Sequence, residues 1–352
     1  MYKFGLSPIA NGQDQRNAKA QWLELQTNRQ ASFDVMKDIA IQSGFLAPNA
    51  SAKNVQLKIG EMYRELDGDV TMEPKAVGNQ ATLQRLLSKA QPVNIGKKVV
   101  EHRRVGEAGK AGRSMSGQTG IVIDHTDSNY QAAIVPIFDG GYGRDWRDVE
   151  AQRSEMFDAL SEDSIEVEYT VLEDVNSYLW NGDAELEVKG NTWGGIKGDS
   201  TIATASLSVD WSASASSAQD IVNEVLKTVD VLRITNNCTD GLTLAVSPQT
   251  MTNWLRPTST NDATFGNIYQ FVKATLAGRI IDIYEDSALT GNQAFFYVDS
   301  RQGFHAKMGM AMSSYALPRF KHNDPYDFIK WMAAGFMSKT TYAGKFKALY
   351  AS

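Results

Sequence analysis

The sequence is poor in the residues that crosslink a chain or hold it in a membrane. Its 352 residues include one cysteine, Cys238, which can form neither an internal disulfide nor a cysteine-based zinc site. No stretch approaches 18 uninterrupted apolar residues, and the N-terminus lacks the apolar run of a signal peptide. We therefore expect a soluble protein, made in a reducing compartment, without a membrane span.

Positive charge is not in excess either. Lysine and arginine total 35 against 41 aspartate and glutamate residues, a net charge of −6. This balance argues against a surface built as a whole to bind nucleic acid. The 42% hydrophobic content, with seven tryptophans, excludes a wholly disordered chain and suffices for one large or two ordinary domains.

Motifs that carry chemistry are incomplete. Residues 109–111, Gly-Lys-Ala, lack both the serine or threonine and the leading glycine of a phosphate-binding loop. Residues 112–117 resemble a nucleophile elbow but have the wrong glycine spacing. The histidine and aspartate pairs in residues 125–127 and 322–324 lack a third ligand at a suitable spacing, and solvated polar groups account for them. We predict a protein that is not an enzyme and holds no metal and no cofactor.

The first 95 residues are expected to form an arm of short helices and loops. Trp22 begins one apolar helical stripe, and residues 80–90 carry three leucines of another before Pro92. Between these stripes the chain has too few large apolar groups to close a core. We therefore expect the arm to pack on another surface.

Residues 96–137 have the pattern of a long hairpin. Residues 97–105 alternate as a strand, five glycines fall within residues 106–120, and residues 121–123 and 132–137 indicate returning strands. A two-stranded hairpin is only marginally stable in water. This segment therefore needs a partner surface.

A long helix is predicted over residues 166–180. Val171, Val175 and Leu179 recur at helical spacing, and Asn-Gly at residues 181–182 is typical of a helix C-terminus.

The following part of the chain alternates helix and strand in an α+β unit. Ser247 and Pro248 place a capping residue before a first-turn proline, a specific helix start. The expected helices cover residues 218–232, 248–255 and 265–276, and the expected strands cover residues 242–246, 279–284 and 294–299, with further strands in residues 326–350.

Charge is unevenly distributed along the chain. Residues 94–115 carry six basic and two acidic residues, a net charge of +4, whereas residues 145–187 carry two basic and fourteen acidic residues, a net charge of −12. Residues 301–352 carry a net charge of +6. Their basic side chains either face an anion or protect strand edges from aggregation. A solvated surface accounts for each segment alone. Together they favour a basic hairpin lying on the acidic helix of a second copy, because charge pairing sets register and partner choice.

This succession of elements resembles the Hong Kong 97-type fold of tailed-bacteriophage major capsid proteins, which encapsulin shells share. The resemblance is carried by the hairpin, by the helix running into Tyr178-Leu-Trp-Asn-Gly-Asp, by the Trp193-Gly-Gly-Ile-Lys loop, by Val246-Ser-Pro-Gln-Thr, and by the closing stretch Thr341-Tyr-Ala-Gly-Lys-Phe-Lys. It implies an α+β fold with an N-terminal arm at residues 1–95, an extended loop at 96–140, a peripheral domain at 141–190 and 320–352 that contains the long spine helix, and an axial domain at 191–319.

The resemblance implies a late structural protein of the virion. Such a major capsid protein self-assembles, as hexamers and pentamers, into the icosahedral shell around the double-stranded DNA genome of a bacteriophage (Caudoviricetes). Implied partners are separate scaffolding and portal proteins, decoration proteins, and packaged DNA contacted without sequence specificity. Because the chain begins at Met1, we expect no cleaved scaffolding segment. Synthesis in the bacterial host cytoplasm is implied as well.

Two alternatives stay open. An encapsulin-like nanocompartment shell would use the same fold to hold an enzyme cargo. An enzyme would need a clustered acid, base and nucleophile, which the motifs above do not supply.

Contact between copies is expected at the arm, the hairpin and the long helix. The candidate contact residues are Trp22, Lys97, Lys98, Val99, Arg103, Arg104, Lys110, Arg113, Ile121, Ile123, Glu166, Glu168, Glu173 and Asp174. Lys110 takes the position of the lysine that forms an isopeptide bond in some relatives, but no matching asparagine and glutamate align with it.

Overall fold

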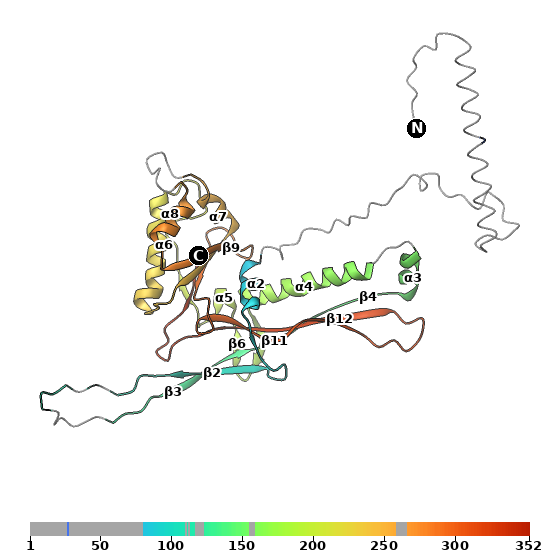
Figure 1. Cartoon of the computed structure of the whole chain (residues 1–352), viewed down its shortest axis with the longest axis horizontal. Coiled ribbons are helices and arrows are strands. Elements are labelled where there is room, and N and C mark those ends of the chain that lie inside the picture. The colour runs from blue at the N-terminus through green and yellow to red at the C-terminus, as the bar shows by residue number, and fades with distance from the viewer. Residues whose placement is uncertain are drawn as a thin grey trace, which may run out of the picture. The chain divides into compact units, whose positions relative to one another are not determined.

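The computed structural model describes Thr27 and residues 80–109, 111, 113–116, 123–154, 159–257 and 266–352. The chain divides into two units, residues 1–73 and 74–352, and the architecture described here is that of the second (Figure 1). The predicted helical stripe beginning at Trp22 lies outside the described residues. Within the described ranges, no helix combines the length and apolarity that a membrane span requires.

The first sheet has four strands in the order β1-β11-β12-β4. Its long central strands, β11 (Phe304–Ala316) and β12 (Tyr326–Ser338), are antiparallel. β4 (Ile137–Arg144) runs antiparallel to β12, and the short β1 (Gln91–Pro92) runs parallel to β11. Helix α4 (Ala159–Asn181) lies along one face of this sheet (Figure 1).

Helix α4 follows from an uninterrupted helical sequence with one apolar face. Residues 159–181 contain neither glycine nor proline, and Val171, Val175 and Leu179 are buried against the sheet. Gly182 follows the helix with φ +69°, the left-handed conformation of a C-terminal cap. The helix starts before the predicted residue 166, because its first turns are mainly polar and show no apolar repeat.

The second sheet has five strands in the order β7-β13-β10-β8-β9. β10 is antiparallel to β8 and β13, whereas β8 with β9 and β13 with β7 are parallel pairs. The strands are β7 (Ala203–Ala205), β8 (Leu242–Val246), β9 (Ile280–Glu285), β10 (Ala294–Tyr297) and β13 (Ala348–Ala351).

The two faces of this second sheet belong to different hydrophobic cores. On β10, Phe295 and Tyr297 join the core shared with α4 and the four-stranded sheet, whereas Ala294 and Phe296 join the core formed with three helices. Alternation with period two is the geometry of a strand. The three helices are α6 (Ala218–Asp230), α7 (Pro248–Trp254) and α8 (Ile268–Thr275).

Each of these three helices begins at a side-chain cap. Ser217 accepts a hydrogen bond from the Asp220 amide, and Asn267 accepts one from the Gln270 amide. Ser247 accepts one from the amide of Thr250 at 3.1 Å, which confirms the predicted helix start. A π-helical turn, Val231–Thr235, extends α6.

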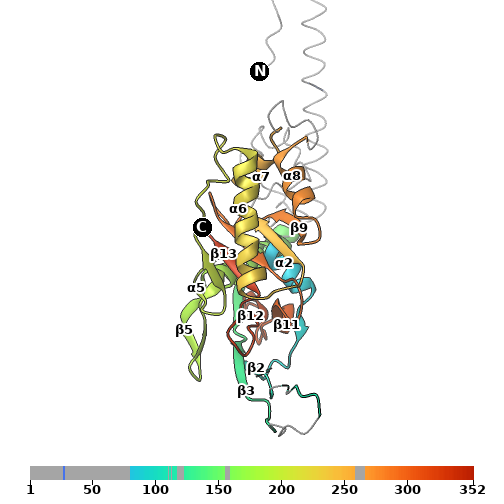
Figure 2. The same ribbon diagram turned by 90° about the vertical axis from the view of Figure 1, so that its left-hand side faces the viewer.

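The remaining elements are shorter. They are α2 (Ala81–Ser88), the hairpin strands β2 (Val99–Val105) and β3 (Ser128–Ile134), α3 (Trp146–Ser154), the ribbon strands β5 (Asp183–Val188) and β6 (Asn191–Trp193), and α5 (Gly195–Gly198). In both views the hairpin lies away from α6, α7 and α8 (Figures 1 and 2).

The structure differs from the sequence prediction at the end of the arm. The arm is expected to pack on another surface, but Leu83 and Leu86 are buried in this chain's own core and β1 pairs with β11. The Asp286 carboxylate accepts a hydrogen bond from the Thr82 amide at 2.7 Å, which ties α2 to the same body. The partner surface is more than 200 residues away in the chain, so local patterning does not reveal it.

Strand pairing also groups segments differently from the predicted domain ranges. β11 falls within residues 191–319 but belongs to the four-stranded sheet, and β13 falls within residues 320–352 but belongs to the five-stranded sheet. β4 begins at Ile137 and joins the four-stranded sheet rather than the loop. Periodicity identifies strands but not their neighbours. The domain boundaries stay a prediction.

Replacing Gly182 by alanine is expected to destabilise the fold strongly. A Cβ at Gly182 would lie 2.2 Å from the carbonyl oxygen of Trp193, whereas Gly190 has a similar φ of +76° and no atom within 4 Å of that position. Gly190→Ala therefore measures the cost of backbone strain without a steric clash, which we expect to be about 1 kcal/mol. We expect urea denaturation to show a loss of about 3 kcal/mol or more for Gly182→Ala. Equal losses in the two variants would contradict the steric explanation.

Candidate functional site

The hairpin of β2 and β3 extends beyond the strands on which its base rests (Figure 1). The pairing runs from Val99 opposite Ile134 to Val105 opposite Ser128. Toward the tip, Met115 and Ile123 are almost fully exposed, Ile123 at 94%. Such isolated apolar side chains on a two-stranded ribbon have no core of their own to enter.

The two faces of the hairpin have different roles. Arg103 and Tyr130 are opposite each other and exposed on the outward face. His102 and Gln131 form the next pair and are half-buried on the face turned to the body. The alternation leaves Glu101, Arg103 and Val105 exposed on the outside and a polar anchoring surface inside.

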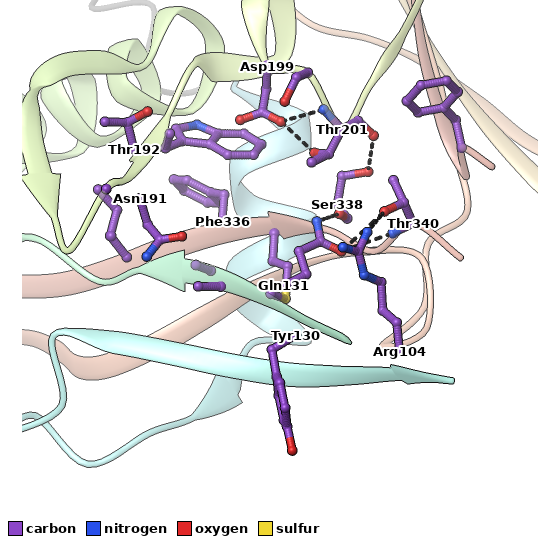
Figure 3. Close-up of a pocket in the computed structure, with 18 of the residues that line it drawn as sticks. Arg104, Tyr130, Gln131, Asn191, Thr192, Asp199, Thr201, Phe336, Ser338 and Thr340 are labelled. Carbon is purple, nitrogen blue, oxygen red and sulfur yellow. Dashed lines mark hydrogen bonds between the residues drawn. The ribbon is translucent and has the colours of Figure 1, made fainter. Parts of the chain in front are cut away.

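Polar contacts anchor the base of the hairpin to the end of β12 (Figure 3). The Arg104 guanidinium donates to the Thr340 hydroxyl at 2.7 Å. The Gln131 amide nitrogen donates to the Ser338 carbonyl oxygen at 2.7 Å, and its amide oxygen accepts from the Thr340 backbone N–H at 3.2 Å. These bonds fix the base of the hairpin, whereas Met115 and Ile123, toward the tip, are exposed.

A cavity of about 560 Å³ lies beside this anchor. Its walls come from β3, from the β5–β6 ribbon, from the loop at Asp199 and from the end of β12 (Figure 3). The Asp199 carboxylate accepts from the Thr201 amide at 2.8 Å and from the Gly194 amide at 3.2 Å. These bonds hold the loop in place, which gives the carboxylate a structural role.

A group of basic side chains lies near the same base, where β2, β11 and β12 meet. Burial, reinforced by Lys307 and Lys339, lowers the pKa of His305 to about 3. Burial, reinforced by Lys339 and Arg301, lowers the pKa of Lys307 to about 8. The pKa of His102 is lowered by burial first and then by Lys339 and Arg104. No sequence motif marks this group, although the alternation in β11 places His305 and Lys307 on the face opposite Phe304 and Ala306.

The acidic helix α4 is partly neutralised within its own chain. Glu168 accepts from Lys330 of β12 at 2.7 Å, and Asp163 binds the Arg144 guanidinium through both oxygens. Glu173 and Asp174 are exposed. The predicted contact role of Glu168 therefore competes with an internal ion pair.

The structure divides the other predicted contact residues into three groups. Val99 packs against the chain's own core, and Arg104 is held by Thr340. Exposed residues are Lys97, Lys98, Arg103, Arg113, Ile123 and Glu166. Trp22, Lys110 and Ile121 lie outside the described residues. In the part of the chain that the structure describes, no group of three or more His, Cys, Asp or Glu side chains could hold a metal ion.

Removing the Gln131 anchor should loosen the hairpin. Gln131→Ala deletes three hydrogen bonds to Ser338 and Thr340, so we expect amide hydrogen exchange in β2 and β3 to speed up by about tenfold. Tyr130→Ala, on the outward face, is the matched control and should leave exchange nearly unchanged. Equal exchange in wild type and Gln131→Ala would show that the anchor lies elsewhere.

The buried histidine predicts an acid sensitivity with a definite sign. Because the pKa of His305 is lowered from 6.5 to about 3 on folding, the unfolded chain binds the proton more readily. The contribution of the neutral His305 ring to the free energy of unfolding is complete above pH 6.5. It is lost as the pH falls, at up to about 1.4 kcal/mol per pH unit. Urea denaturation from pH 6.5 to 4.5 should show a steeper loss for wild type than for His305→Gln; parallel curves would refute this.

Comparisons with known proteins agree with the fold. A search of curated proteins finds no match. A chain of the capsid of Myoviridae phage XM1 superposes with a TM-score of 0.63 at 8% identity, covering 87% of this chain and 99% of that one. A chain of the capsid of a native GTA particle gives 0.57 at 10% identity, covering 86% and 100%. A virus-like particle from Pyrococcus furiosus gives 0.50 at 11% identity, covering 79% and 96%.

At these identities the likeness concerns the fold, and it confirms the resemblance seen in the sequence: the chain has the Hong Kong 97-type capsid fold, with mixed helix and sheet. Residues 49–351 match the family described as a family of unknown function, DUF6260. That match spans most of the sequence, so this chain belongs to the DUF6260 family.

Proposed function

We propose that this chain is a capsid shell subunit, and more specifically the major capsid protein of a tailed bacteriophage. The observation that carries the proposal is the hairpin, which projects exposed apolar and basic side chains beyond the strands that anchor it. A single copy leaves this surface in water. A closed shell of copies buries it.

Burial of the hairpin supplies the driving force for assembly. Each apolar side chain removed from water contributes about 25 cal/mol per Å² of buried surface. One such contact is weak, but a subunit held by several neighbours gains from all of them at once. Hexamers and pentamers tiled into an icosahedral shell would provide this arrangement.

A second apolar surface lies on the face of the four-stranded sheet opposite α4. Lys330 points to α4, so its neighbour Trp331 points away from the helix. Trp331 contacts Tyr315 with ring centroids 5.5 Å apart, and both side chains are more than a third exposed. In a shell this face would also be covered by another copy.

Charge would set which surfaces meet. Lys97, Lys98 and Arg103 are exposed on the hairpin, and Glu173 and Asp174 are exposed on α4. We propose that the hairpin of one copy lies near α4 of the next, because opposite charges favour this register over others.

The other expected partners follow from the phage role. The shell would enclose double-stranded DNA without sequence-specific contact, assemble with separate scaffolding, portal and decoration proteins, and form in the host cytoplasm. A net charge of −6 suits a DNA container, since a strongly basic lining would bind the genome tightly and resist packing and release. The proposed role is structural and not enzymatic.

The second candidate is an encapsulin-like compartment shell. The similarity to the virus-like particle from Pyrococcus furiosus favours it. The contents separate the two roles, since nuclease-protected double-stranded DNA in particles from the native source supports the phage capsid. A protein cargo without DNA supports the compartment.

Charge reversal on the hairpin should block assembly and be rescued on α4. We expect negative-stain electron microscopy of the purified wild type to show uniform polyhedral particles, and Lys97→Glu/Lys98→Glu to remain as small oligomers. Glu173→Lys/Asp174→Lys should also fail alone, because each variant places like charges together. The chain carrying all four changes should regain particles.

Circular dichroism and urea denaturation serve as the folding control for these variants. A wild type that stays monomeric at all concentrations and salt conditions would refute the shell proposal. Particles in the hairpin variant, or no recovery in the fourfold variant, would refute only the pairing with α4.

A further inference from the structure

A second cavity, of about 390 Å³, lies between α2 and the turn joining β10 to β11. Leu86 and Phe304 form its apolar wall. Its polar lining consists of Lys89, Asp299, Ser300, Arg301 and His305. The cavity is distinct from the one at the hairpin base, although His305 also belongs to the basic group near that base. It has no part in the contacts proposed for assembly.

His305 is the most unusual group in this lining. Its side chain is 4% exposed, and neither ring nitrogen makes a hydrogen bond of normal geometry within the described part of the chain, although the Gly303 backbone lies within reach of the ring. A buried polar group without a partner costs about 1–3 kcal/mol. Since the neutral ring carries one N–H donor, it is suited to a ligand that accepts a hydrogen bond.

The cations around the cavity exceed the anions. Lys89 and Asp299 form a 2.5 Å ion pair and balance each other. Arg301 is exposed and forms no ion pair with any described residue, and it is close enough to Lys307 to help lower the pKa of that amine.

The groups behind His305 are basic or neutral. Lys307 is 3% exposed and donates to the neutral Gln91 side chain at 2.5 Å. Lys339 and His102 also face this region. Lys307 is therefore a buried cation without a charged hydrogen-bond partner, and a bound anion nearby would stabilise it.

We propose that this cavity binds a phosphate group, held by the guanidinium of Arg301, the ring N–H of His305 and the hydroxyl of Ser300. A phosphate offers several acceptor oxygens, which suit the planar fork of arginine and a second donor at the same time. The cavity exceeds the volume of a single halide ion. The phosphate could be free or could belong to a nucleic-acid backbone, and the site does not depend on shell assembly.

Calorimetric titration of the full chain tests the site. The chain is titrated with inorganic phosphate at constant ionic strength, and separately with a double-stranded DNA oligomer. We expect Arg301→Gln to weaken binding by about tenfold, as loss of a charge-assisted hydrogen bond predicts. Lys321→Gln, which removes an exposed charge beyond the other end of β11, is the matched control and should bind as wild type does.

The two titrations identify the source of the phosphate. Binding of inorganic phosphate that depends on Arg301 supports a free ligand, and Arg301-dependent binding of DNA alone supports a backbone phosphate. Because His305→Gln could disturb folding, the test uses the Arg301 variant. A shift of the His305 ring nitrogen resonances in the NMR spectrum during titration reports directly on binding at this ring. No binding in either titration, or equal binding by wild type and Arg301→Gln, would overturn the proposal.

Discussion

A two-stranded ribbon cannot bury both of its faces, and this constraint shapes the whole molecule. The hairpin of β2 and β3 uses its inward face at the base, where Gln131 and Arg104 bind the end of β12. Its outward face and tip have no such surface and stay exposed. A second chain is the simplest source of the missing surface, which is why the proposed function is assembly rather than chemistry.

The body that carries the hairpin is stiffened by strands shared between layers. β10 places aromatic side chains in one core and Phe296 in the other, so neither layer can shift without disturbing both. β12 contacts α4 and β4 and anchors the hairpin through its last residues. A rigid base of this kind allows contacts at the distant tip to set the position of a whole subunit.

Charge serves two purposes in this chain. On the surface, the basic hairpin and the exposed acids of α4 are suited to choosing a register between copies. In the interior, Lys307 is a buried cation whose hydrogen-bond partner, the Gln91 side chain, is neutral, and it lies beside the neutral His305 ring. Surface charges act over the distances of an encounter, whereas the buried group acts only on a ligand that enters the cavity.

Elements that depend on local patterning can be predicted from the sequence alone. The apolar repeat at Val171, Val175 and Leu179 predicted α4, the Ser247-Pro248 pair predicted the start of α7, and the glycine-rich stretch predicted an extended hairpin. Each signal lies within a few residues, so no knowledge of neighbours is needed. Their order was enough to indicate the capsid fold.

The contacts between distant segments, in contrast, become visible in the folded chain. The hydrogen bond from the Thr82 amide to Asp286 ties α2 to the body, and β11 pairs with β1 and β12. Glu168 forms an ion pair with Lys330. Folding also brings His305, Lys307 and Lys339 together. These outcomes depend on contacts between residues far apart in the chain, where the free energy comes from mutual burial and charge rather than from any local preference, and a single sequence carries no direct record of them.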